Sequence, residues 1–276
     1  MNRIKIGYSP CPNDTYIFYA LVHGKLTYEP FVSEVLADIE TLNNMAMSNE
    51  LDVAKVSFHA FAHLRENYCL LHAGGALGRG CGPLVISKKE TEINSLQNLC
   101  VAIPGKMTTA ALLLRLYDSN IEDIVVLPFD KIIEAVYRGD VDAGLIIHES
   151  RFTYQQYGLK SVLDLGEWWE DTTGHAIPLG GILIRRELGT DHIKEFDSAL
   201  RASVEFAHSN FQQVRDYVCS HAQEIDDSVI QAHIDLYVNK FTLDYGSEGE
   251  AAITDLLMRA ENADLIPAST HSIFVS

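Results

Sequence analysis

Residues 139–150 constrain the fold of this chain most strongly. Within them, residues 143–147 form a continuous apolar run (Ala-Gly-Leu-Ile-Ile), a pattern typical of a parallel strand covered on both faces. In α/β proteins the ligand crevice lies at the carboxyl ends of such strands. His148 follows the run directly, so it is expected at that edge. A histidine there can also do no more than cap a strand or bind a carbonyl group, and this segment alone favours that simpler role.

The rest of the chain alternates between short apolar runs and helical patterns. Strands are expected at residues 4–8, 29–35, 52–56, 69–73, 83–87, 100–103, 124–127, 143–147 and 176–184. Helices are expected at residues 16–22, 39–47, 57–64, 110–117, 131–137, 192–207, 211–222, 227–238 and 249–262. The pattern predicts an α/β fold with two lobes and a ligand cleft between them. The first lobe is expected to hold residues 1–88 and 180–276, and the second residues 89–179.

Composition narrows the classes of partner. The 276 residues are 47% hydrophobic and 21% charged, as in ordinary globular proteins with real cores. The formal net charge of −17 argues against a nucleic acid or an anionic membrane as partner, because both need a basic surface. A small anionic ligand stays possible, since backbone N–H groups at helix N-termini can hold an anion inside an acidic protein.

Neither the N-terminus nor the cysteines indicate export. Residues 1–6 enter a strand without the apolar region of a secretory signal, and no apolar run is long enough to span a bilayer. The cysteines are odd in number and none has CxxC spacing; they are Cys11, Cys69, Cys81, Cys100 and Cys219. The sequence therefore predicts a cytoplasmic protein with reduced thiols and no zinc site.

The loop at residues 9–15, after the first expected strand, carries polar groups. It contains two prolines and the polar residues Ser9, Asn13 and Asp14. Asn13 or Asp14 could cap the helix expected at residues 16–22. The loop is either a rigid turn with a good cap or a ligand-binding loop, and the residues favour neither.

Two further strand ends carry groups that suit an anionic ligand. Lys55, Val56 and Ser57 end the strand at 52–56, and a lysine inside so apolar a strand could pair with a ligand carboxylate. Thr108 and Thr109 follow a glycine-bearing loop at the start of the helix at 110–117, where a helix N-terminus can bind an anion. Thr108 could equally serve only as the N-cap.

Two other segments are less informative. Residues 74–82 hold five glycines in nine residues, but no helix follows, so this is not a nucleotide-binding loop. It is expected to be a tight or flexible connection, with Arg79 near a ligand. Phe152, Tyr154, Tyr157, Trp168 and Trp169 could wall an aromatic pocket, although such clusters more often pack in cores.

Three segments together resemble one enzyme family. They are SPCPNDTYIFYALVHGK at 9–25, GGALGRGCGPLV at 74–85 and GLIIHESRFTYQQYGL at 144–159. They are similar to the 1,4-dihydroxy-6-naphthoate synthases of the futalosine route to menaquinone, and the resemblance extends over nearly the whole chain. Members of that family typically carry Phe where this chain has Tyr16.

The resemblance implies a fold, a reaction and a set of residues. The fold is that of type II periplasmic binding proteins. The reaction is a carbon–carbon lyase step that converts cyclic dehypoxanthine futalosine, a small anionic substrate, to 1,4-dihydroxy-6-naphthoate and the three-carbon dihydroxyacetone, with no cofactor or metal. The family's catalytic histidine matches His148. Its substrate-binding positions match Lys55, Val56, Ser57, Thr108 and Thr109.

The residue types agree with that chemistry. Fragmentation to an aromatic ring needs a proton removed next to a carbonyl, and a neutral imidazole is available as a base near neutral pH. Ser9, Asn13 and Asp14 are expected to bind sugar hydroxyls or an enolate oxygen. Glu149 is not expected to orient His148, because neighbouring residues of a strand point to opposite faces. The alternative is a non-catalytic cytoplasmic binding or sensor protein of the same fold.

Overall fold

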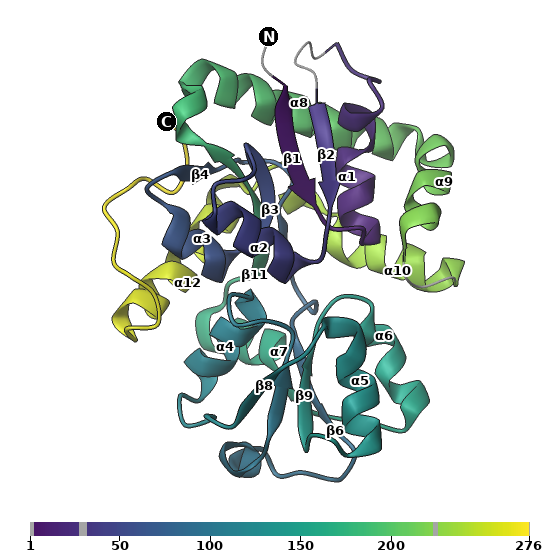
Figure 1. Cartoon of the computed structure of the whole chain (residues 1–276), viewed down its shortest axis with the longest axis vertical. Helices are drawn as coiled ribbons and strands as arrows, with labels where there is room; N and C mark the ends of the chain where they lie inside the picture. Colours follow the sequence, from purple (N-terminus) through teal and green to yellow (C-terminus); the bar gives the residue numbers. More distant parts are fainter. Residues whose placement is uncertain (1–2, 28–31, 223–225, 276) are drawn as a thin grey trace.

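The computed structural model describes residues 3–27, 32–222 and 226–275, and the chain folds into two α/β lobes stacked along its long axis (Figure 1). The described residues form one sheet in each lobe. The two-lobe α/β architecture predicted from the sequence is therefore confirmed.

The sheet of the first lobe has the strand order β2-β1-β3-β11-β4, with β5 also paired to β11. Its strands are β1 (Ile4–Tyr8), β2 (Val32–Leu36), β3 (Val53–Ser57), β4 (Tyr68–Leu70), β5 (Ala76–Gly78) and β11 (Ile177–Arg185). Strands β1, β2 and β3 are parallel, whereas β11 is antiparallel to β3, β4 and β5. The long strand β11 thus follows the second lobe in the sequence and lies inside the first sheet.

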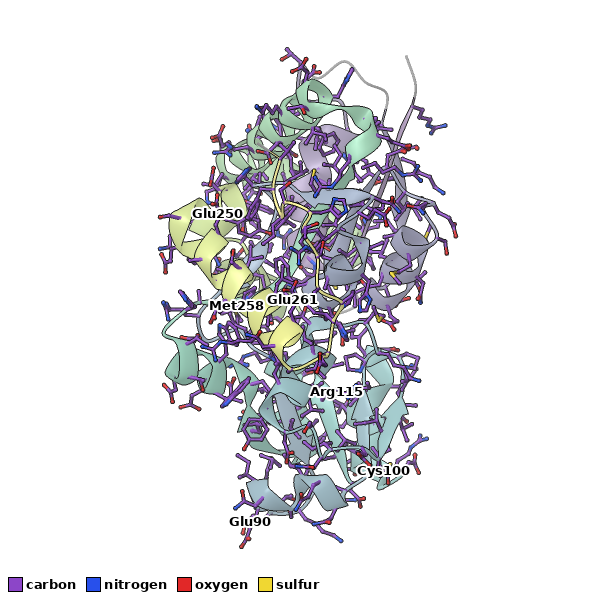
Figure 2. All side chains as sticks on the ribbon, turned by 90° about the vertical axis from the view of Figure 1, so that its left-hand side faces the viewer. Glu90, Cys100, Arg115, Glu250, Met258 and Glu261 are labelled. Carbon is purple, nitrogen blue, oxygen red and sulfur yellow. The ribbon has the colours of Figure 1, made fainter. Side chains whose placement is uncertain are left out.

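Helices from both ends of the chain cover this sheet (Figure 1). They are α1 (Pro12–Val22), α2 (Ile39–Met47), α3 (Phe58–Leu64), α8 (Thr190–Ser209), α9 (Phe211–His221), α10 (Asp227–Tyr237), α11 (Lys240–Leu243) and α12 (Gly246–Asn262), with a short 3-10 turn η3 (Arg186–Leu188). Figure 2 shows Glu250, Met258 and Glu261 along α12, on the outside of the molecule. No helix within the described ranges has both the length and the hydrophobicity to cross a membrane.

The second lobe is continuous in sequence. Its sheet has the order β10-β6-β9-β7-β8. Its elements are β6 (Leu84–Ser87), η1 (Ile93–Asn98), β7 (Val101–Ile103), α4 (Thr109–Tyr117), β8 (Ile124–Val126), α5 (Phe129–Arg138), β9 (Ala143–Ile146), α6 (Ser150–Thr153), η2 (Tyr154–Tyr157), β10 (Lys160–Asp164) and α7 (Leu165–Thr173). Strand β9 is the apolar run of the sequence, and all four of its residues are buried.

Strand β6 lies in a different lobe from the one predicted. The sequence placed residues 83–87 in the first lobe, but β6 pairs with β9 and β10 in the second sheet. The chain therefore crosses between the lobes at the glycine-rich segment and not at the polar residues 88–96. The crossing is tight, because a Cβ atom at Gly82 would lie 2.3 Å from the backbone of Gly166. The other predicted bounds of the lobes stay predictions.

Two more local predictions need correction. Helix α1 begins at Pro12 with Cys11 as its N-cap, so Asn13 and Asp14 lie in its first turn and do not cap it. Proline suits the first helical position because its fixed φ angle and missing N–H group cost nothing there. Strand β10 and helix α7 had no expected counterpart. Part of the strand expected at 29–35 lies outside the described residues, and β2 begins at Val32.

One apolar core crosses the boundary between the lobes. Phe58 of α3, Leu112 of α4 and Leu183 of β11 belong to the same buried cluster, together with Trp169 of α7. A second cluster packs α1 and α8 against the first sheet, and a third fills the second lobe between its sheet and α5. Apolar burial thus stabilises the lobes against each other, with the polar groups described next lying between them.

Candidate active site

A cavity lies between the two lobes, and loops that follow strands of both sheets line it. Its lining residues are Asn13, Asp14, Ile39, Lys55, Ser57, Ala76, Cys81, Gly82, Pro83, Thr108, Thr109, Ala110, Ile147, His148, Leu179, Gly180, His233 and Tyr237. Six of the residues singled out from the sequence, namely Asn13, Asp14, Lys55, Ser57, Thr108 and Thr109, thus share one cavity with His148.

Lys55 and Asp14, which both line this cavity, form a buried ion pair. The distance from Nζ of Lys55 to Oδ1 of Asp14 is 2.9 Å, and both side chains are almost fully buried. Lys55 lies on β3, where side chains alternate between faces, so Lys55 and Ser57 point the same way. A buried charge needs a partner, and Asp14 supplies it from the first turn of α1.

The Asp14 carboxylate is held from three further directions. Its Oδ2 accepts hydrogen bonds from the backbone N–H and the hydroxyl of Ser9, at 3.3 and 2.7 Å. Its Oδ1 accepts a hydrogen bond from Nδ2 of Asn13 at 2.8 Å. Ser9 therefore lies behind Asp14 and fixes it, and Ser9 is not among the residues that line the cavity.

His148 lies at the turn that follows β9. Its φ angle is +56°, a left-handed conformation that few residues other than glycine adopt. Such strained positions cluster at functional sites, because the surrounding structure must hold them in place. The ring is half-buried, its Nδ1 lies 3.6 Å from Sγ of Cys11, and it packs against Phe129. Burial lowers the pKa of His148, whereas the nearby carboxylates of Glu149 and Asp14 raise it.

Cys11, His148 and Glu149 place one sulfur, nitrogen or oxygen atom each within 4.8 Å of the others. Burial raises the pKa of the Cys11 thiol well above its ordinary value, and the charge of Glu149 adds to the effect. With its pKa raised in this way, the sulfur is a protonated thiol near neutral pH.

His233 of α10 lies beside this group and is fully buried. Its ring is nearly parallel to that of His148, with centroids 6.4 Å apart. Its Nε2 lies 2.9 Å from Oδ1 of Asn13, and its Nδ1 lies 3.7 Å from Oε2 of Glu149. Burial lowers the pKa of His233 well below its ordinary value, and the charges of His148 and Lys55 lower it further.

Ser57 is held by the fully buried Asn43 of α2. Oδ1 of Asn43 accepts a hydrogen bond from the backbone N–H of Ser57 at 3.0 Å, and its Nδ2 lies 3.4 Å from both the Ser57 hydroxyl and the carbonyl of Met107. Asn43 therefore links the two lobes beneath the cavity, and it was not singled out from the sequence.

Thr108 and Thr109 begin α4, and the structure already uses both hydroxyls. Thr108 is the N-cap of α4, as predicted, because its hydroxyl accepts a hydrogen bond from the N–H of Ala111. The same hydroxyl donates to the carbonyl of Gly105. The Thr109 hydroxyl accepts a hydrogen bond from the N–H of Phe58 at 2.8 Å and donates to the carbonyl of Leu179 at 2.5 Å. Thr109 thus fastens the second lobe to the first, and the remaining donors at this helix end are backbone N–H groups.

Replacing Thr109 by valine should therefore destabilise the protein. Valine keeps the shape of threonine but leaves the Phe58 N–H and the Leu179 carbonyl without a partner in a buried place, at a cost of about 1–3 kcal/mol for each group. Urea unfolding measures the loss. Thr109→Ser is the matched control, because it keeps the hydroxyl and removes only a methyl group. If serine costs as much as valine, the hydroxyl does not fasten the lobes.

The remaining predicted site residue lies elsewhere. The Val56 side chain faces the opposite side of β3 from Lys55 and Ser57 and is buried in the core that joins the lobes. Its side chain does not line the cavity. The cavity lining also lacks Trp168, Trp169 and the three aromatic residues of 152–157. Among the described residues that line the cavity, the one Phe, Tyr or Trp side chain is that of Tyr237.

The sequence analysis did not single out His233, and it did not predict that Glu149 lies beside it. In α10, His233 stands among Ile230, Ile234 and Tyr237, which are all buried. A histidine on an apolar helix face is more often an ordinary core residue. Glu149 lies next to His233 because the chain turns at His148, so the alternation of a strand no longer applies.

Comparisons with known proteins were made at three levels. Residues 4–262 match the sequence profile of a family described as menaquinone biosynthesis. A 1,4-dihydroxy-6-naphtoate synthase of Thermus thermophilus is 48% identical over 275 residues and covers all of both chains. A synthase of the same name from Streptomyces coelicolor is 48% identical over 272 residues, which are 97% of this chain and 96% of that protein.

Two solved structures have a fold similar to that of this chain. A crystal structure of an Archaeoglobus fulgidus protein is 39% identical, with a TM-score of 0.90 over 96% of this chain and 98% of that chain. A Candida albicans protein, described as having the generic periplasmic binding protein fold, is 14% identical, with a TM-score of 0.71 over 98% of this chain and 92% of that chain. The predicted periplasmic-binding-protein-like fold is confirmed. With a profile match over nearly its whole length, this chain belongs to the menaquinone biosynthesis family.

Proposed function

We propose that this enzyme converts cyclic dehypoxanthine futalosine to 1,4-dihydroxy-6-naphthoate and dihydroxyacetone, with His148 as the general base. The names of the two curated relatives support the naphthoate product. The observation that carries the proposal is the placement of His148, which enters the cavity between the lobes in a strained conformation beside a buried ion pair.

The surroundings of His148 suit a base. Because burial lowers the pKa of its imidazole, the neutral form prevails near neutral pH. The reaction needs the tautomer with its proton on Nδ1, where it can donate to Sγ of Cys11, so that the lone pair of Nε2 is available. His148 then takes the proton that starts ring opening, the carbon–carbon bond breaks, and formation of the aromatic ring drives the step.

Groups around the base suit the rest of the substrate. The backbone N–H groups at the start of α4 would hold the substrate carboxylate, since the helix dipole favours an anion there. Lys55 and the second N–H of the Asn13 amide lie on the other wall and would stabilise oxygen that becomes negative as the bond breaks. Ser57 would bind a sugar hydroxyl, and Ser9 and Val56 would act only through Asp14 and through the strand.

A turnover assay tests the proposal. Purified protein is mixed with cyclic dehypoxanthine futalosine, and formation of the naphthoate and of dihydroxyacetone is followed by absorbance and mass spectrometry. Binding of the substrate is measured separately by calorimetry. Formation of both products is the expected result. Binding without conversion would leave a binding or sensor protein of this fold, and absence of binding would remove the substrate assignment altogether.

A further inference from the structure

Two buried acceptor atoms face each other beside His148. Oε2 of Glu149 and Nδ1 of His233 are 3.7 Å apart, both are shielded from solvent, and neither has a hydrogen-bond partner. An unpaired buried polar atom is destabilising, and two lone pairs facing each other add repulsion. A proton on either atom would replace this repulsion by an attractive contact.

The hydrogen bonds on the other side of His233 determine its tautomer. Oδ1 of Asp14 accepts hydrogen bonds from Lys55 and from Nδ2 of Asn13, which orients the Asn13 amide. The amide oxygen of Asn13 therefore points to Nε2 of His233, and only a protonated Nε2 can donate to it. Nδ1 of a neutral His233 is then a bare acceptor, and an ionised Glu149 would present a second one.

We propose that Glu149 and His233 hold one proton between them, so that the pair beside the base carries no net charge. The proton can reside on the carboxyl group or on Nδ1; in both cases the two charges sum to zero. Glu149 is thus a positioning residue for His148, and His233 neutralises it. The inference rests on the proposed function of His148 and adds two residues to that site.

The consequence concerns the protonation of His148. Glu149 comes within 4.8 Å of His148, and a bare carboxylate at that distance would stabilise the imidazolium and oppose the effect of burial on the pKa of His148. The other groups that face this cluster are Cys11 before α1, Asp14 from α1, Asp38 before α2, Lys55 from β3 and Tyr237 from α10. Asp14 is already paired with Lys55 and Asp38 is exposed to solvent, so Glu149 is the buried carboxyl group whose charge remains to be cancelled.

Glu149 also borders a surface groove between α5 and α6, which Phe129, Tyr137 and Tyr157 line as well. The residue that carries the pair's carboxyl group thus lies near the outside of the second lobe as well as near the cavity. The protonation of the pair can be measured in the free protein.

The first test measures the proton directly. Nuclear magnetic resonance of the free protein, labelled with ¹³C and ¹⁵N, reports the ionisation of the Glu149 carboxyl and the protonation of both His233 nitrogens. We expect, at pH 7, either a protonated carboxyl beside a neutral Nε2–H imidazole or a carboxylate beside an imidazolium. An ionised Glu149 beside a neutral His233 would overturn the inference. This test needs no substrate, so it decides the matter even if the proposed reaction fails.

The second test uses the pH dependence of kcat/KM. In His233→Gln the side-chain amide can donate an N–H to Glu149 but has no titratable proton, so Glu149 stays ionised and the acid limb of the profile moves up by about 1 pH unit. Adding Glu149→Gln to that variant removes the carboxylate and returns the limb to its original pH. If His233→Gln lowers the rate but leaves the limb in place, His233 only packs in the site and the inference is wrong.

Discussion

Replacing His148 by asparagine will lower kcat by about two to four orders of magnitude, the range that a positioned general base contributes. Asparagine has no basic nitrogen, but it tolerates the left-handed conformation that the chain adopts here, with a φ angle of +56°. The substrate affinity, measured separately by calorimetry, should change little. The loss then belongs to the chemical step and not to the fold.

His148→Ala is the comparison that separates chemistry from backbone strain. Alanine also lacks a basic nitrogen, but it adopts the left-handed region less readily than asparagine, which should lower the free energy of unfolding by about 1–2 kcal/mol. We expect both variants to lose the same activity, while only alanine unfolds noticeably earlier in urea. A loss of less than tenfold in asparagine would mean that His148 positions the substrate and that another group takes the proton.

Replacing Lys55 by methionine will destabilise the protein by about 3–5 kcal/mol, because the Asp14 carboxylate is left buried without its counter-charge. The ion pair spans 2.9 Å between side chains that are almost fully buried. Methionine retains much of the length and volume of lysine, so packing changes little. Urea unfolding of Lys55→Met against the unmodified chain measures the loss.

The double variant Lys55→Met, Asp14→Asn provides the control. It removes both charges and keeps an amide that can accept from Ser9, so it should recover a large part of the lost stability. Its activity should stay low, since the cavity has lost its cation. Equal stability of the single and double variants would show that the hydrogen bonds from Ser9 and Asn13 alone satisfy the carboxylate.

Local chemistry allowed the best predictions. The Thr108 cap, the strand that ends before His148 and the lysine inside β3 all depend on a few neighbouring residues. The same local arguments explain Val56, because alternation along β3 places it opposite Lys55. Val56 was named as a substrate-binding position only through the family resemblance, which gives positions and not the faces of a strand on which they lie.

Packing between distant segments was beyond such arguments. His233 meets Asn13 from 220 positions along the chain, and no periodicity marks that contact. Ser9 was expected to bind a ligand, but its hydroxyl donates a hydrogen bond to Asp14 instead. Strand β6 was assigned to the wrong lobe because an apolar run predicts a strand without naming its partners, and those partners, β9 and β10, come about 60–80 positions later.

The insertion of β11 into the first sheet sets an order of assembly. Strands β4 and β5 have β11 as their named sheet partner, whereas the five strands of the second sheet all lie between Leu84 and Asp164. During synthesis the second lobe can therefore complete its sheet before the first, although the first begins at the N-terminus. The first sheet, which holds the earliest residues to leave the ribosome, is complete only after Ile177–Arg185 has been made, and the cavity between the lobes forms once α10 has brought His233 into place.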